Sequence, residues 1–321
     1  MVSTAFGFGE NDTYLIQCPS RRCYHNLPSG LVTLLEQGDV AEVLNVAFGP
    51  GGSYAMAFRE PCSRGYRLQT DRLPADLESW LFKTGWFGNY KRSFSTMQIS
   101  LGPKTGRFFA SDGKSSLWDE LPPKLEQKFA SMRQNGGTGG WISKQPTLVS
   151  FGSGDDFVLL AKAEDETEIF WELKGYPELA KALQTILDND RLADLKNLSL
   201  SPFKKDTFAL LIDDIFVQNG VLAKFLPAFE KFGEDVKLDA AAARPARQEE
   251  MQPEASSSQR MSAVDVPVMS TSDSLKLHHA SLLSTQDYIF DGLAKKRCQH
   301  CMKPEGVCVC PLPYYLTDFI R

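Results

Sequence analysis

The chain has 321 residues, of which 42% are hydrophobic, and carries a net charge of −5 at pH 7. This acidic balance argues against electrostatic attraction of the whole surface to nucleic acid or to an anionic membrane. No apolar run approaches the ~20 residues of a membrane span, and the first residues lack a secretory signal. The seven cysteines, four of them crowded near the C-terminus, are not distributed like a disulfide framework, so we expect a reducing compartment, cytoplasmic or nuclear.

A repeated unit of roughly 50 residues organises the first 238 residues. Each copy reads as a strand ending in an apolar residue and a small one, a turn, a second strand opened by an aromatic residue, and a third strand. The five anchors and their aromatic residues are Phe8-Gly9 with Tyr14, Phe48-Gly49 with Tyr54, Leu101-Gly102 with Phe108, Phe151-Gly152 with Phe157, and Leu200-Ser201 with Phe208. Spacings of 40, 53, 50 and 49 residues are typical of propellers, solenoids or arrays.

A Leu-Pro pair predicts the start of a helix after the third strand in copies one to three, at Leu27, Leu73 and Leu121. Apolar residues three and seven positions after each proline share one helix face. Copy four differs, because Tyr176-Pro177 is followed one residue early by Leu179, Leu183 and Leu187. In copy five, Leu226-Pro227 falls inside a run that already reads as helical from Val221.

An aromatic residue precedes the helix start in three copies, as Tyr24, Trp118 and Trp171. These side chains could form a ligand platform, but we expect core contacts where the third strand meets the helix.

These elements predict a strand-rich α+β fold of five β-β-β-α repeats, in copies near 1–40, 41–93, 94–145, 146–198 and 199–238. We expect a closed propeller-like ring, because an open array would expose sheet edges and need caps. A plain propeller with added helices, or separately packed α+β units, remains an alternative.

Residues 239–280 change to alanine, proline, serine and charged residues, a composition that predicts a disordered linker. Residues 281–321 are expected to hold a short helix, with Ser284 as its N-cap, followed by a four-cysteine knuckle.

The cysteine cluster is the one chemically specific motif, with Cys298, Cys301, Cys308 and Cys310 spaced as C-x2-C-x6-C-x-C. Four thiolates can surround one tetrahedral zinc ion, and such a closed site is structural. His300 could replace one thiolate, or the thiols could be unligated.

The stretch from Cys298 to Pro311 resembles the cysteine-rich opening of DTW-domain proteins, which are tRNA-uridine aminocarboxypropyltransferases. The resemblance implies a similar metal knuckle. In that family a long catalytic domain follows the cysteines, and neither such a domain nor the Asp-Thr-Trp signature occurs here, so the activity is not carried over.

Catalytic motifs are absent from the sequence, and His25 is the only histidine of the repeat region. A nucleophile pair with Cys23 would need a third, orienting group, and we expect packing instead. The glycine run Gly49–Gly52 is expected to be a hairpin turn and not a phosphate cradle, and the Asp213-Asp214 pair a solvated turn.

We therefore expect a non-catalytic scaffold that binds a protein partner, with a zinc-stabilised tail. The alternative is an enzyme or an RNA-acting protein whose site lies at the centre of the ring.

Overall fold

The computed structural model describes residues 3–62, 65–85, 88–132, 144–163 and 166–250. The described strands form five three-stranded antiparallel sheets, each made of strands that follow one another in the chain. The sheets are β1 (Ala5–Phe8), β2 (Tyr14–Gln17) and β3 (Arg22–His25); β4 (Glu42–Phe48), β5 (Tyr54–Arg59) and β6 (Tyr66–Asp71); β7 (Gln98–Leu101), β8 (Phe108–Ser111) and β9 (Ser116–Asp119); β10 (Gln145–Phe151), β11 (Phe157–Lys162) and β12 (Thr167–Glu172); β13 (Leu195–Leu200), β14 (Phe208–Ile212) and β15 (Ile215–Asn219).

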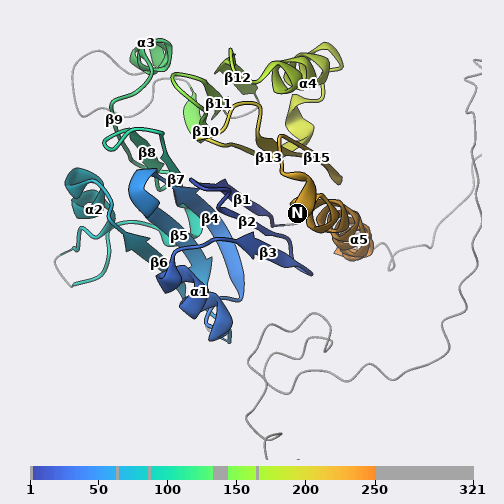
Figure 1. Ribbon diagram of the computed structural model, residues 1–321, viewed down its shortest axis with the longest axis horizontal. Helices are drawn as coiled ribbons and strands as arrows, with labels where there is room; N and C mark the ends of the chain where they lie inside the picture. Colours follow the sequence, from blue (N-terminus) through green and yellow to red (C-terminus); the bar gives the residue numbers. More distant parts are fainter. Residues whose placement is uncertain (1–2, 63–64, 86–87, 133–143, 164–165, 251–321) are drawn as a thin grey trace, which may run out of the picture.

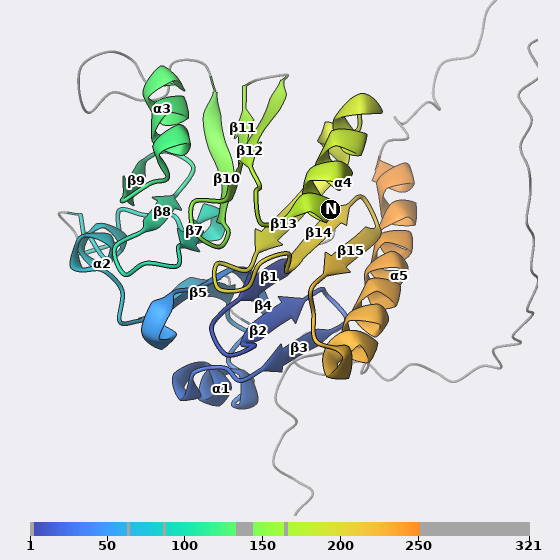
Figure 2. The ribbon, with the colours of Figure 1, turned by 45° about the horizontal axis from the view of Figure 1, so that its top comes forward.

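A helix follows each sheet, and the helices lie toward the outside of the molecule while the first strands lie near its middle (Figure 2). The α-helices are α1 (Ser29–Glu36), α2 (Ala75–Leu81), α3 (Pro123–Met132), α4 (Pro177–Asp188) and α5 (Leu226–Glu250), with a short 3-10 helix, η4 (Ala223–Phe225), before α5. The predicted strand-rich α+β fold of repeated β-β-β-α units is confirmed. Among the described helices, none is long and apolar enough to cross a membrane.

The predicted anchors close the first hairpin of every unit. In each sheet the apolar anchor residue lies opposite the aromatic residue of the second strand, as Phe48 does opposite Tyr54. The backbone N–H of the following small residue donates to the carbonyl of the residue before that aromatic. This bond measures 2.7–2.8 Å at all five positions, which are Gly9, Gly49, Gly102, Gly152 and Ser201.

The first four helices share one register when it is counted from their first residue. The third and seventh helical residues are buried in each, and are Leu31 and Leu35, Leu77 and Leu81, Leu125 and Phe129, and Leu179 and Leu183. The offset of copy four disappears because its proline is the first helical residue, whereas Pro28 and Pro74 precede their helices. The prediction for Leu187 was wrong: it is 37% exposed and Ile186 is buried, because eight residues from Leu179 turn the side chain about 80° off the face.

Helix α5 differs from the prediction at both ends. It begins at Leu226 and not at Val221, since η4 intervenes. It also runs through Ala240–Ala243, so the predicted end of the repeat domain at Leu238 falls inside a helix. Alanine has the highest intrinsic helix propensity, which explains why the alanine-rich composition there continues the helix.

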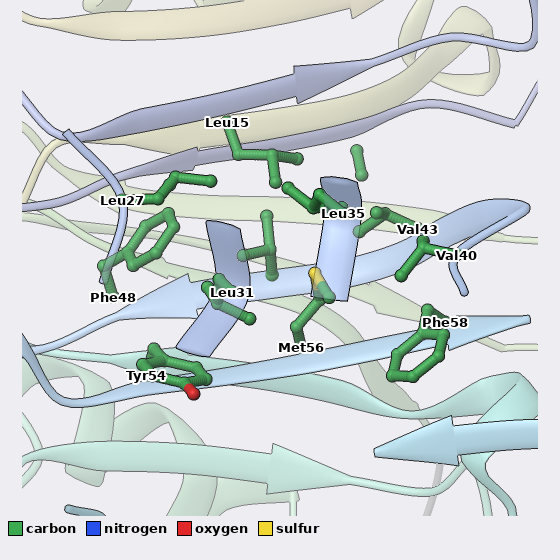
Figure 3. Packing of buried hydrophobic residues seen from close by; sticks show 12 residues of the cluster. Leu15, Leu27, Leu31, Leu35, Val40, Val43, Phe48, Tyr54, Met56 and Phe58 are labelled. Atoms are coloured by element: carbon green, nitrogen blue, oxygen red, sulfur yellow. The ribbon is translucent and has the colours of Figure 1, made fainter. Parts of the chain in front are cut away.

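Buried side chains form five clusters, and each cluster lies between two sheets. The first is drawn in Figure 3, where Leu31 and Leu35 of α1 lie between Leu15 of β2 and Met56 of β5. The next three clusters use α2, α3 and α4 in the same way between successive sheets. The fifth places Phe229 and Phe232 of α5 between the last sheet and the first. In Figure 1 the N-terminus accordingly lies beside α5.

Middle strands have both faces buried, so their residues alternate between two clusters. In β5, Tyr54 and Met56 belong to the first cluster, whereas Ala55 and Ala57 belong to the second. Burial of both faces explains why these strands read as continuous apolar runs. We call the region between the fourth and fifth sheets, with α4, the fourth interface, and the region between the fifth and first sheets, with α5, the fifth interface.

Candidate functional site

The first strands of the five sheets meet around a small central cavity. Strand β1 contacts β4, β4 contacts β7, β7 contacts β10, β10 contacts β13, and β13 contacts β1. The approach is close: a Cβ atom at Gly7 would come within 2.8 Å of the Val46 side chain. Small residues face one another at the same place in each strand, and they are Gly7, Ala47, Ser100, Ser150 and Ser199.

Polar side chains connect these first strands across the sheets. Asn45 accepts a hydrogen bond from the Ile99 N–H at 3.0 Å, and Ser150 accepts one from the Leu200 N–H at 2.8 Å. Ser100 donates to the Val149 carbonyl. The Asn197 amide donates to the Thr4 carbonyl at 2.8 Å and so joins the last unit to the first.

The central cavity is small. Its volume is about 60 Å³, which is room for a few water molecules. Among the described residues that line it, none has a titratable side chain. The polar groups there serve the contacts between strands.

A second repeated feature, which the sequence reasoning missed, is the polar residue directly before the aromatic of each second strand. Thr13 donates to the Asn26 carbonyl at 2.9 Å, and Thr207 donates to the Gly220 carbonyl at 3.2 Å. Asp156 instead accepts from the Gly175 N–H at 2.6 Å. These bonds hold the chain where it leaves the third strand. The sequence signal that could have revealed this feature is the polar residue at the same position in all five copies.

Arg107 occupies this position in the third unit, with only 5% of its surface exposed. Its guanidinium donates to the Glu120 carbonyl at 2.9 Å and to the Gly154 carbonyl at 2.6 Å, and pairs with Asp155 at 2.9 Å. Because Glu120 and Gly154 belong to successive units, the side chain clamps two repeats together and has a structural role.

The fifth interface contains an open pocket of about 230 Å³. Five aromatic residues line it, namely Phe8 and Tyr14 of the first unit and Phe203, Phe225 and Phe229 of the last. Hydroxyl, amide and charged side chains surround it, namely Asn11, Asp12, Thr13, Ser201, Lys204 and Thr207. A cavity of ~150 Å³ suffices for benzene, so this pocket can hold a single aromatic ring.

The charges at the mouth of this pocket balance each other. Lys204 and Asp12 lie 3.9 Å apart, with 43% and 38% of their side chains exposed. An exposed pair of this kind contributes little to stability. The pocket therefore combines aromatic walls with a rim that carries no excess charge, an arrangement suited to binding an uncharged group.

No family model, curated protein or solved structure matches this chain. Any functional assignment therefore rests on the geometry of the chain itself.

The predicted zinc ligands Cys298, Cys301, Cys308 and Cys310 lie outside the described residues. Within the described residues, no group of three or more histidine, cysteine, aspartate or glutamate side chains could hold a metal ion. The zinc assignment therefore stays a prediction from the sequence.

Cys18, Cys23 and His25 lie in the fifth interface, where the thiols of Cys18 and Cys23 and the His25 ring have different surroundings. Both thiols are free. Burial raises the pKa of Cys18 to about 11 and also raises the pKa of Cys23, so both thiols stay protonated at neutral pH. The His25 ring lies 4.4 Å from that of Phe225 and 6.2 Å from that of Tyr14, which confirms the expected packing.

The two turns noted in the sequence have structural partners. Gly49–Gly52 joins β4 to β5 as the expected hairpin turn. The Gly51 N–H donates to the Glu10 carboxylate at 2.9 Å, so this amide already has an acidic side chain as its hydrogen-bond partner. Asp213 lies in the β14–β15 turn and pairs with Arg191 at 3.5 Å.

The aromatic residues before the helices divide into two groups. Trp118 and Trp171 pack against buried clusters as expected, and the Trp118 ring lies 4.9 Å from that of Phe129. Tyr24 differs, with 37% of its surface exposed.

Proposed function

We propose that this chain is a non-catalytic scaffold for a protein partner, built as a closed propeller-like ring with a zinc-stabilised tail. The aromatic pocket of the fifth interface is the observation that carries the functional part. It offers apolar walls and hydrogen-bonding groups to a partner, and interface anchors are typically aromatic side chains buried in such pockets.

Closure of the ring is supported by the fifth cluster and by the bond from Asn197 to Thr4. The fifth cluster is built from the same kinds of element as the other four, namely a middle strand from each of two units and one helix. In an open array, the first and last sheets would each keep an uncovered face. Here Ile16 of β2 and Leu211 of β14 are both buried in that cluster.

The zinc-stabilised tail rests on the spacing of Cys298, Cys301, Cys308 and Cys310. A closed four-thiolate site would contribute folding free energy to a short segment that has little other core.

The scaffold proposal is tested by photo-crosslinking in cells. A photoreactive benzoylphenylalanine replaces Lys204 at the mouth of the pocket in the full chain. The control carries the same group at Leu187, which is exposed on α4. We expect one protein to be crosslinked from position 204 and not from 187. No crosslinked protein at 204, or the same proteins from both positions, would contradict the proposal.

A further inference from the structure

The fourth interface shows what fills the space that is open in the fifth. Tyr176 directly precedes α4, and none of its surface is exposed. Its hydroxyl accepts a hydrogen bond from the Ser153 N–H at 2.8 Å and donates to the Ser201 carbonyl, with the Lys204 carbonyl 3.3 Å away. A phenol ring of the chain itself therefore joins the fourth and fifth units.

In the fifth interface Leu222 stands before the helical segment in place of the phenol, with a backbone that differs from that of Tyr176, whose φ is −137° and ψ 60°. Leu222 directly precedes η4 and has the extended backbone that leads into a helix, with φ −61° and ψ 142°. Gly9 takes the place that Ser201 has in the fourth interface, because both are the small residue after a first strand. Leu222 and Gly9 both line the 230 Å³ pocket.

A hydrogen-bond acceptor is available in this pocket. The Gly9 N–H donates to the Thr13 carbonyl, while the Thr13 N–H donates to the Glu10 carbonyl. Among the described residues, none donates to the Gly9 carbonyl. The corresponding carbonyl of Ser201 accepts from the phenol of Tyr176.

We propose that the pocket of the fifth interface binds the phenol ring of a tyrosine presented by a partner protein. The ring lies among Phe8, Tyr14 and Phe225, in offset or edge-on contacts of the kind that aromatic rings prefer. Its hydroxyl donates to the Gly9 carbonyl. The inference that a partner protein supplies the ring rests on the proposed scaffold function. The preference for a phenol rests only on the comparison of the two interfaces.

The first test compares p-cresol with toluene on the full chain, by ligand-observed NMR titration. The two probes differ only in the hydroxyl group. We expect p-cresol to bind about 5-fold more tightly, the effect of one neutral hydrogen bond. Intermolecular NOEs from the p-cresol ring to the Leu222 methyl groups are expected to locate the probe without any substitution. Equal binding of both probes, or NOEs only to other residues, would overturn the assignment.

A substitution of Leu222 provides the second test. Leu222→Tyr introduces a phenol of the chain itself at a residue that lines the pocket, so p-cresol binding should weaken at least 10-fold. The matched control is Leu187→Tyr, which adds the same side chain on the exposed face of α4 and should leave binding unchanged. Undiminished binding to a folded Leu222→Tyr chain would overturn the proposal.

A third comparison identifies the source of the ring. A short peptide with a central tyrosine should compete with p-cresol, and the same peptide with phenylalanine should compete less well. The chain has its own tyrosines beyond residue 250, at 288, 314 and 315. If replacing these three by alanine in the full chain raises the affinity for p-cresol, the ring comes from this chain and the partner assignment is wrong. A failed phenol test would leave the crosslinking result at Lys204 intact, so the two proposals fail separately.

Discussion

The fourth and fifth interfaces are built from corresponding elements and differ in the residue that precedes the helical segment, which is Tyr176 in one and Leu222 in the other. Both place a helix between two middle strands and both bury large apolar residues, including Leu183 in one and Phe232 in the other. In the fourth interface, Tyr176 fills the end that lies next to the hairpin turns. In the fifth interface, Leu222 lines an open pocket. The comparison places a buried phenol in one interface and a pocket at the corresponding end of the other, and it is this difference on which the proposed binding of a tyrosine rests.

Removing the ring of Tyr176 should have the largest effect. Tyr176→Ala takes away a fully buried aromatic side chain and leaves the Ser153 N–H without its acceptor. We expect the free energy of unfolding to fall by about 3–5 kcal/mol, measured by chemical denaturation. Tyr176→Phe is the matched control, which keeps the ring but also leaves the Ser153 N–H without its acceptor, and should cost about 1–3 kcal/mol. p-Cresol should restore part of the stability lost in Tyr176→Ala. Equal losses in the two variants would show that the ring itself contributes nothing.

The proposed closure of the ring predicts that the fifth interface is as important for stability as the fourth. Phe232→Ala should therefore lower the free energy of unfolding by about 3–5 kcal/mol, in one transition with the rest of the repeats. Leu183→Ala, its counterpart in the fourth interface, is expected to cost about 2–5 kcal/mol. In an open array, the contact between the last and first units would be dispensable. An early, separate transition in Phe232→Ala, or a loss well below 1 kcal/mol, would contradict closure.

The buried thiol of Cys18 makes the fifth interface sensitive to high pH. Below pH 9 this thiol is protonated in both the folded and the unfolded chain. Between pH 9 and about 11 only the unfolded chain ionises there, because burial raises the folded pKa to about 11, so the free energy of unfolding falls. We expect ionisation of Cys18 in the unfolded chain to lower the free energy of unfolding by up to about 2 kcal/mol. The measurement is the difference in the pH dependence of that free energy between the natural chain and Cys18→Ala. Identical curves for the two proteins between pH 8 and 11 would reject this role.

The smallest effect on the repeats is expected from the predicted zinc site. Cys298→Ser combined with Cys301→Ser should remove about one equivalent of zinc and leave the main unfolding transition in place, because the linker predicted from the sequence would separate the tail from the repeats. Metal analysis and thermal unfolding check this together. Metal-free protein with four titratable thiols, purified under reducing conditions, would reject the zinc assignment. A large fall in the temperature of the main unfolding transition would instead show that the tail docks on the repeats. The pocket of the fifth interface would then be a candidate for the docking site.

The sequence by itself determined the five units and most of their secondary structure, because these depend on local patterns. Anchor pairs such as Phe48 and Tyr54 are separated by one short turn, and the hairpin that joins them needs no distant contact. The helix faces likewise depend on spacing within one turn or two, as with Leu31 and Leu35. The helix of copy four seemed offset, and Leu187 was placed on its buried face, because positions were counted from the proline. A proline can either precede a helix or be its first residue.

Only the tertiary structure decided which units meet and what lies between them. A middle strand with two buried faces shows no alternation, so its sequence cannot reveal that Tyr54 and Ala55 belong to different clusters. The pocket needs both Gly9 and Leu222 in its lining, although 212 residues lie between them in the chain. No local pattern carries that information, since the closing contact depends on the summed rotation of all the units. The difference between Tyr176 and Leu222 becomes meaningful only after the two interfaces are compared in space.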